Sequence, residues 1–114
     1  AVPWSEVRES LSKLLGVTRA VVFRHPALRE FQTAAIWYEA QRTGLGVQFE
    51  LEVSRAVELA ADHPLRYPRV LGNIHCVRVR RFPYSVYFLA EAHRVVVLAV
   101  FHARRHPLIW QSRK

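Results

Sequence analysis

The apolar residues in the first half of the chain recur at helical spacing, which predicts two helices. The first opens at His25–Pro26, because proline is well tolerated at the start of a helix, and it ends near Gln41. The second follows the two glycines of residues 42–46 and ends at His63–Pro64. Helices joined by so short a turn pack antiparallel, so a helical hairpin is expected. The apolar faces are formed by Leu28, Phe31, Ala35 and Tyr38 in the first helix, and by Phe49, Val53, Ala56, Val57 and Ala60 in the second.

The second half of the chain alternates instead, which predicts three strands in a meander. Residues 75–81 and 83–91 alternate, whereas residues 94–102 are apolar on both faces and should form a strand that is central or covered on both sides. A further strand is predicted at residues 19–23, and a short amphipathic helix at residues 4–15. The expected fold is therefore α+β: a helical hairpin packed on a twisted antiparallel β-sheet in the order β-α-α-β-β-β, with an extra N-terminal helix.

The charge of the chain is concentrated in this second half. The formal net charge is +8, yet residues 1–62 hold seven basic and eight acidic groups, a balance of −1. Residues 63–114 hold ten basic groups against Glu91 alone, a balance of +9. Such a field attracts nucleic acid or an acidic protein, whereas the simpler interpretation is a solvated basic face of an arginine-rich protein.

Composition excludes several classes of protein. The longest aliphatic run, residues 95–101, is far shorter than the roughly 20 residues that a membrane helix needs, so no membrane association is expected. A lone cysteine, Cys76, rules out an internal disulfide and fits a reducing cytoplasm, and we see no signal peptide. His102 and His106 have a ligand-like spacing, but Pro107 disfavours a helix through the pair and there is no second cysteine. We therefore predict neither a metal nor a cofactor, and a cytoplasmic protein of bacterial type.

Four strings of residues together carry a resemblance to a known family. AAIWYEAQRTGLGVQF (34–49), HPLRYPRV (63–70), RRFPYSVYF (80–88) and VVVLAVFHARRHPLIW (95–110) occur in the order and spacing of the RelE/ParE superfamily. The chain is therefore similar, over about residues 19–113, to the toxins of bacterial type II toxin–antitoxin systems. The resemblance implies a small basic toxin that a cognate antitoxin protein neutralises. It leaves open whether the assembly is a homodimer or a heterotetramer with the antitoxin.

The resemblance offers two targets, of which the ParE-like one is favoured. ParE-like toxins bind and poison DNA gyrase without a catalytic centre. The WYE…GLG turn and the C-terminal HxRRxPxxW pattern of this chain resemble those of the plasmid-stabilisation proteins of this branch. A cationic, aromatic edge at the end of the last strand would contact the target. The predicted target-binding residues are Arg78, Arg80, Arg81, Tyr87, His102, Arg104, Arg105 and Trp110.

The alternative is a RelE-like endoribonuclease that cuts messenger RNA in the ribosome. Such cleavage needs a base, an acid and cations for the phosphate. Arg81, His102 and Arg104 could supply them, since a histidine titrates near neutral pH, but Trp110 stands near the place of a RelE tyrosine and cannot transfer a proton. A third reading is a degenerate toxin that only binds its antitoxin. Trp37 and Tyr38 are expected to anchor helix to sheet rather than to bind anything.

The chain departs from the family pattern in two places. Residues 1–16 precede the usual start of the family domain, so we divide the chain into residues 1–16, an accessory helix similar to an antitoxin tail, and residues 17–114, the toxin-like domain. Phe88 stands where relatives commonly have tyrosine, and Ile74, His75 and Cys76 replace a more basic stretch. These departures bear on the activity rather than on the fold.

Overall fold

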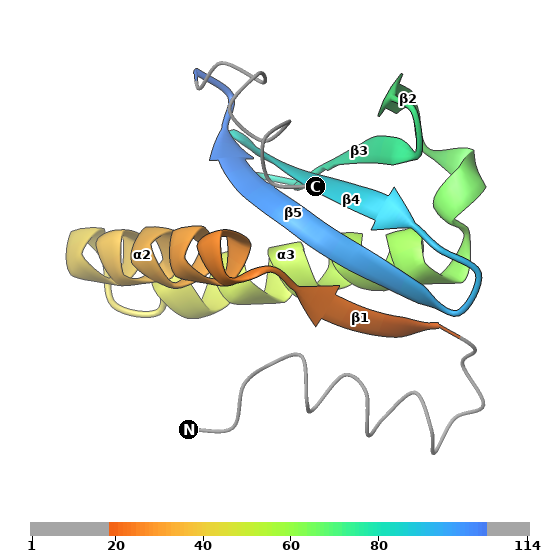
Figure 1. Ribbon diagram of the computed structural model, residues 1–114. Helices are drawn as coiled ribbons and strands as arrows, with labels where there is room; N and C mark the ends of the chain where they lie inside the picture. The colour runs from red at the N-terminus through yellow and green to blue at the C-terminus, as the bar shows by residue number, and fades with distance from the viewer. Residues whose placement is uncertain (1–18, 105–114) are drawn as a thin grey trace.

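The sheet forms around the segment that is apolar on both faces. The computed structural model describes residues 19–104, and the helix predicted at residues 4–15 lies outside this range, as does the proposed division at residue 16. Two helices cover one face of a five-stranded sheet (Figure 1). The elements are β1 (Ala20–Phe23), α2 (His25–Gln41), α3 (Leu45–Asp62), the 3₁₀ turn η1 (Pro64–Arg66), β2 (Arg69–Leu71), β3 (Ile74–Arg78), β4 (Tyr84–Ala90) and β5 (Arg94–His102).

The strand order confirms the predicted α+β fold and adds two features to it. The order is β1-β5-β4-β3-β2, with antiparallel pairing from β5 through β4 and β3 to β2. β1 instead runs parallel to β5, with Ala20 opposite Arg94 and Phe23 opposite Val97. The sheet is therefore mixed, because the hairpin and the meander carry the chain back so that β5 runs alongside β1 in the same direction. The short edge strand β2 was not predicted from the pattern.

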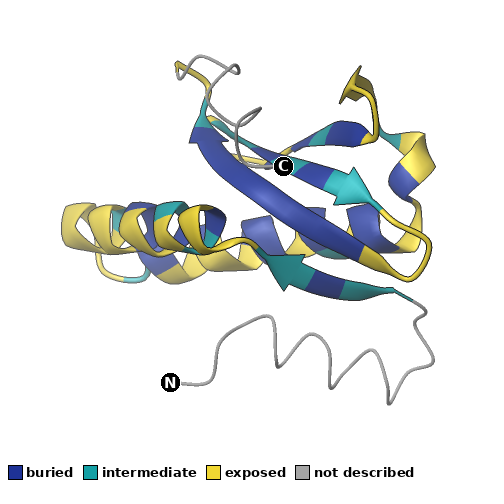
Figure 2. Cartoon of the chain, in the orientation of Figure 1, coloured by how far each residue is buried: buried dark blue, intermediate teal, exposed yellow. Residues whose placement is uncertain are grey.

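β5 is the inner strand that the sequence predicted. All seven residues from Val95 to Phe101 are buried in two apolar clusters on the two faces of the sheet. Their alternation is interrupted once, because Leu98 and Ala99 both belong to the cluster away from the helices, where the pairing of β5 with β4 shifts register. The cluster under the helices contains Val95, Val97 and Val100 together with apolar residues of α2 and α3. Figure 2 shows β5 as a continuous buried strand, while the outer sides of the helices are exposed. Burial on both faces fixes the register of this strand, since a shift by one residue would exchange the two faces.

The turn between the helices is held by one carboxylate. Glu39, near the end of α2, accepts hydrogen bonds from the backbone N–H groups of Gly44 (2.9 Å) and Gly46 (3.0 Å). Gly44 has a left-handed φ of +90°, which glycine adopts without strain. Gly46 packs closely on α2, because a Cβ at this position would lie 2.5 Å from the backbone oxygen of Ala35. The hairpin therefore depends on glycine for two different reasons.

Candidate functional site

The strand register brings most of the predicted target-binding residues to one end of the sheet. β3 ends at Arg78, which lies opposite Ser85 of β4, and β4 begins at Tyr84, which lies opposite His102 of β5. The β3–β4 loop and the residues after β5 lie at this end too, since the Ala103 N–H donates to the Pro83 carbonyl over 2.8 Å. We call the basic residues at this end of the sheet the cationic rim. They are Arg78, Arg80, Arg81, His102 and Arg104.

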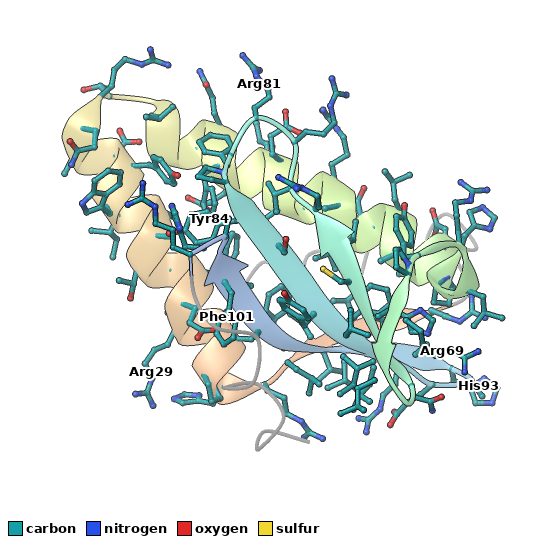
Figure 3. All side chains as sticks on the ribbon, turned by 90° about the horizontal axis from the view of Figure 1, so that it is seen from above. Arg29, Arg69, Arg81, Tyr84, His93 and Phe101 are labelled. Carbon is teal, nitrogen blue, oxygen red and sulfur yellow. The ribbon has the colours of Figure 1, made fainter. Side chains whose placement is uncertain are left out.

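The β3–β4 loop holds two of these arginines outward. The loop is closed by a hydrogen bond from the Val79 N–H to the Tyr84 carbonyl (2.9 Å). Between these residues the Phe82 ring is packed down onto Tyr38 (4.9 Å between ring centroids) and Phe49 (5.2 Å). Arg81 has a φ of +70°, an uncommon conformation for a residue other than glycine, and its side chain is exposed (Figure 3). A partly buried aromatic anchor, Phe82, therefore holds the loop that presents the exposed Arg81.

The positive charge of the second half does not gather at this end alone. Arg69 and His93 lie at the opposite end of the sheet from Arg81 and Tyr84 (Figure 3). Arg94, at the start of β5, is paired with Glu91. By contrast, none of the five rim residues has an ion pair with another residue of 19–104. The rim thus gathers five basic side chains without an ion-pair partner within residues 19–104, while at the opposite end Arg94 is paired and Arg69 has no such partner.

A groove of about 880 Å³ opens beside the rim, between α2 and the ends of β4 and β5. One wall is a stripe along successive turns of α2 and the other is the sheet end, with Val100 at its side. We call it the α2 groove. It is lined by Pro26, Arg29, Glu30, Thr33, Ala34, Trp37, Tyr38, Pro83, Tyr84, Val100 and His102.

His102 belongs both to the rim and to the α2 groove. Its ring lies edge-on to that of Tyr84, with 5.3 Å between the ring centroids. Its Nδ1 accepts a hydrogen bond from the Arg104 backbone N–H over 3.1 Å, which fixes the orientation of the ring and places the proton of a neutral imidazole on Nε2. Such a histidine can bind an acidic group or exchange a proton at Nε2. The sequence predicted this residue as part of the site but gave no sign of the groove.

The adjacent aromatic residues Trp37 and Tyr38 of α2 have different roles. Tyr38 anchors the helix as predicted, because its ring contacts Phe49, Phe82 and Tyr84. Burial, with a smaller contribution from Tyr84, raises the pKa of the Tyr38 hydroxyl, so it stays protonated at neutral pH. Trp37 is 58% exposed and lines the groove, so the prediction that it anchors helix to sheet was wrong. Nothing in the helical period distinguished the two roles, because Trp37 lies beside the apolar face.

The remaining predicted residues lie elsewhere. Tyr87 is in the middle of β4, half-buried with its ring 5.9 Å from that of Phe101. It lies on the same face of the sheet as Arg78, but opposite Cys76 and therefore farther from the sheet end than the rim residues. Its role in target binding stays a prediction. Arg105 and Trp110 lie outside the described residues.

Cys76 lies opposite Tyr87 on this same face and is no candidate nucleophile. Burial raises the pKa of its thiol, and this effect outweighs the opposing effects of Ser85, Tyr87 and Arg78. Only the thiolate reacts with alkylating agents. We expect iodoacetamide to modify Cys76 more slowly in the native protein than in urea at neutral pH, and the native rate to increase as the pH is raised. Mass spectrometry of timed samples measures both rates; equal rates would contradict the burial of this thiol.

Two predicted absences can be examined for the described residues. No group of three or more histidine, cysteine, aspartate or glutamate side chains within residues 19–104 is arranged to hold a metal ion. Neither helix of this region has the length and hydropathy needed to cross a membrane. Within the described residues, the groups available for binding at this site are the cations of the rim and the aromatic rings and polar side chains of the α2 groove.

Comparison with known proteins places this architecture in a family. A solved structure similar to the fold is the chromosomal ParDE toxin–antitoxin system from P. aeruginosa, with 10% sequence identity and a TM-score of 0.64 over 75% of this chain and 96% of that chain. No curated protein matches the sequence significantly. The profile of the family described as the ParE toxin of the type II toxin–antitoxin system parDE matches residues 21–107, most of the chain. This protein therefore belongs to the ParE toxin family of type II toxin–antitoxin systems.

Proposed function

We propose that this chain is the toxin of a type II toxin–antitoxin pair, neutralised by a cognate antitoxin protein, and that it acts in the bacterial cytoplasm by binding DNA gyrase and poisoning it. The observation that carries the proposal is the cationic rim, whose five side chains have no ion-pair partner within residues 19–104. Exposed, uncompensated cations on a fixed loop suit binding to gyrase or to the DNA it holds, because such charges speed and orient association.

The arrangement of the rim favours binding over turnover. Arg78 lies on the face of the sheet away from the helices, with Ser85 and Phe101, whereas His102 faces the α2 groove on the other side. A nuclease needs its base, acid and cations around one phosphate. Glu30, the carboxylate that lines the groove, accepts a hydrogen bond from the Val100 N–H over 3.1 Å. The endoribonuclease with Arg81, His102 and Arg104 remains the alternative, since His102 Nε2 could still act as an acid or base.

The test replaces the rim cations without disturbing the loop. Because Arg81 has a left-handed φ, Arg81→Gly removes the charge without backbone strain. We expect Arg80→Ala combined with Arg81→Gly to weaken inhibition of purified gyrase, followed by DNA supercoiling, by about tenfold or more, a typical effect for two interfacial charges. Arg69→Ala is the matched control, since Arg69 is an equally exposed arginine at the other end of the sheet.

Three readouts distinguish the candidate functions. The chain is expressed inducibly while growth is followed, and the purified protein is added to gyrase and to translation extracts with a defined message. Growth arrest with gyrase inhibition supports the proposal. Message cut at codon-spaced sites with gyrase unaffected would instead establish the endoribonuclease. A chain that causes no growth defect and affects neither system would be a degenerate toxin with an antitoxin-binding role alone.

A further inference from the structure

The face of the sheet away from the helices is buried more completely than the elements of residues 19–104 explain. We call it the outer face. Its cluster consists of Ile74, Val96, Leu98, Ala99 and Phe101, with Tyr87 and Leu89 packed against them, and all of these residues belong to strands. Yet Ile74, Val96 and Leu98 are each 0% exposed. Side chains on a sheet are buried this completely when a second layer covers them, and both helices of the described range lie on the other face (Figure 1).

The chain leaves β5 beside this face. Phe101, an outer-face residue, is the next-to-last residue of β5 (Figure 3). From Val96 to Phe101 the outer face extends five residues along β5, which is about 17 Å. The ten residues 105–114 span up to about 33 Å when extended, so they are long enough to cross it. They also contain a run of four apolar residues, PLIW (107–110), which suits a covering layer.

The segment at the other end of the chain, residues 1–18, joins the sheet in a less suitable place. Arg19, the first described residue, donates from Nη1 to the Ala61 carbonyl near the end of α3 over 3.3 Å, so its side chain points to the helix side of the sheet. Val21 belongs to the cluster under the helices, so the next residue, Val22, faces outward, and it is only partly buried. The outer face is therefore deeply buried along β5, where residues 105–114 begin, and less so at β1, where residues 1–18 end.

We infer that residues 105–114 dock across the outer face of their own sheet, with Leu108, Ile109 and Trp110 as its apolar cover. The domain then has three layers: the helices, the sheet and this segment. The inference goes beyond the proposed function and does not depend on it. It gives Trp110 a place in the core, in contrast to the target contact predicted from the sequence. The outer face is then closed to partners, apart from its rim end, where Arg78 is exposed.

The lone cysteine of the chain reports on this face, because Cys76 lies opposite Tyr87 there. We expect Trp110→Ala, in the full-length native protein, to increase the rate at which iodoacetamide modifies Cys76 by about fivefold or more, since an uncovered thiol ionises and reacts more readily. Mass spectrometry of timed samples measures the rate. Trp37→Ala is the matched control, because it removes the same side chain from an exposed position on α2, and its rate should stay within about twofold of wild type. Val57→Ala controls for general destabilisation: it weakens the core under the helices without uncovering the outer face, and it should also stay within about twofold.

Oxidative cross-linking tests the same contact in a chain that keeps most of its cover. Five full-length variants each carry one new cysteine: Pro107→Cys, Leu108→Cys, Ile109→Cys, Trp110→Cys and Gln111→Cys. After oxidation with copper phenanthroline, we expect at least one to form a disulfide with Cys76 within the same chain, because the two Cβ atoms must approach to about 4 Å. Ile36→Cys, at a residue of α2 that is 71% exposed, should form none.

Several outcomes would overturn the inference while leaving the proposed function intact. One is the absence of any cross-link together with an unchanged Cys76 rate in Trp110→Ala. Cross-links only between two chains would assign the cover to a second copy. A Cys76 rate that rises when residues 1–16 are deleted, but not in Trp110→Ala, would assign the cover to the N-terminal segment. An intramolecular cross-link at any of the five positions, or faster modification of Cys76 in Trp110→Ala alone, supports the inference.

Discussion

Replacing Phe49 by alanine is expected to lower the free energy of unfolding by about 3–5 kcal/mol, the usual cost of removing a buried phenylalanine side chain. Phe49 is fully buried in α3, and its ring lies within 5.0–6.0 Å, between centroids, of four other aromatic rings. Those four are Phe31, Tyr38, Phe82 and Tyr84. Since domains are commonly stable by only about 5–15 kcal/mol, the variant should be close to unfolding.

Urea unfolding followed by circular dichroism measures this loss. The matched control is Leu51→Ala, because Leu51 lies on the same helix but is 59% exposed; its effect should stay within about 0.5 kcal/mol. The variant also bears on the site, since Phe49 supports Phe82, which anchors the loop that carries Arg81. We expect the folded fraction of Phe49→Ala to inhibit the target less than wild type. A loss below about 1 kcal/mol would contradict a core built around this ring.

The sequence was most informative where one face of an element is strongly apolar. The helical period of α2 and α3 and the alternation of β3 and β4 each reflect burial against a single neighbour, so the hairpin and the meander could be predicted with bounds close to those observed. β5 was predicted as an inner strand because it is apolar on both faces, and Val96 and Leu98 are indeed as buried as Val95 and Val97. Such patterns show which residues are buried but not which partners they meet.

The parallel pairing of β1 with β5 illustrates that limit. The paired residues, Ala20 with Arg94 through Phe23 with Val97, are more than seventy positions apart, and no local pattern records the direction of a partner strand. The α2 groove is a second example. It forms where α2 passes the ends of β4 and β5, so its lining residues come from three elements and the β3–β4 loop, whose relative positions only the fold supplies.

The residues of the candidate site also differ in how far the sequence could predict them. Arg78, Arg80, Arg81, His102 and Arg104 could be grouped from the sequence, because consecutive strands of a meander bring alternate strand ends together. Tyr87 was grouped with them as well; it shares the face of the sheet away from the helices with Arg78, but it lies opposite Cys76 in the middle of β4 and not at the sheet end. Trp37 was missed because an exposed tryptophan on a helix gives no periodic signal until a neighbouring groove is known.

Gly46→Ala is the second change for which we expect a large loss of stability, about 2–4 kcal/mol. The added Cβ would lie 2.5 Å from the Ala35 backbone oxygen and 2.9 Å from both Cβ and Oε1 of Glu39. Overpacking of this kind costs about 1–3 kcal/mol. Displacing Glu39 would also weaken its bond to the Gly46 N–H, for a further loss of about 1 kcal/mol. Urea unfolding again provides the measurement.

Two further variants separate the clash from other effects of replacing a glycine. Gly44→Asn should cost about 1 kcal/mol or less, because a Cβ at Gly44 meets nothing within 4 Å and asparagine tolerates the left-handed conformation. Adding Glu39→Ala to Gly46→Ala should not restore stability, since the backbone oxygen of Ala35 and the Cβ at position 39 both remain. Recovery in the double variant would locate the clash in the flexible Glu39 carboxylate. The close approach of α3 to the backbone of α2 would then no longer fix the position of α2, the helix that forms one wall of the groove.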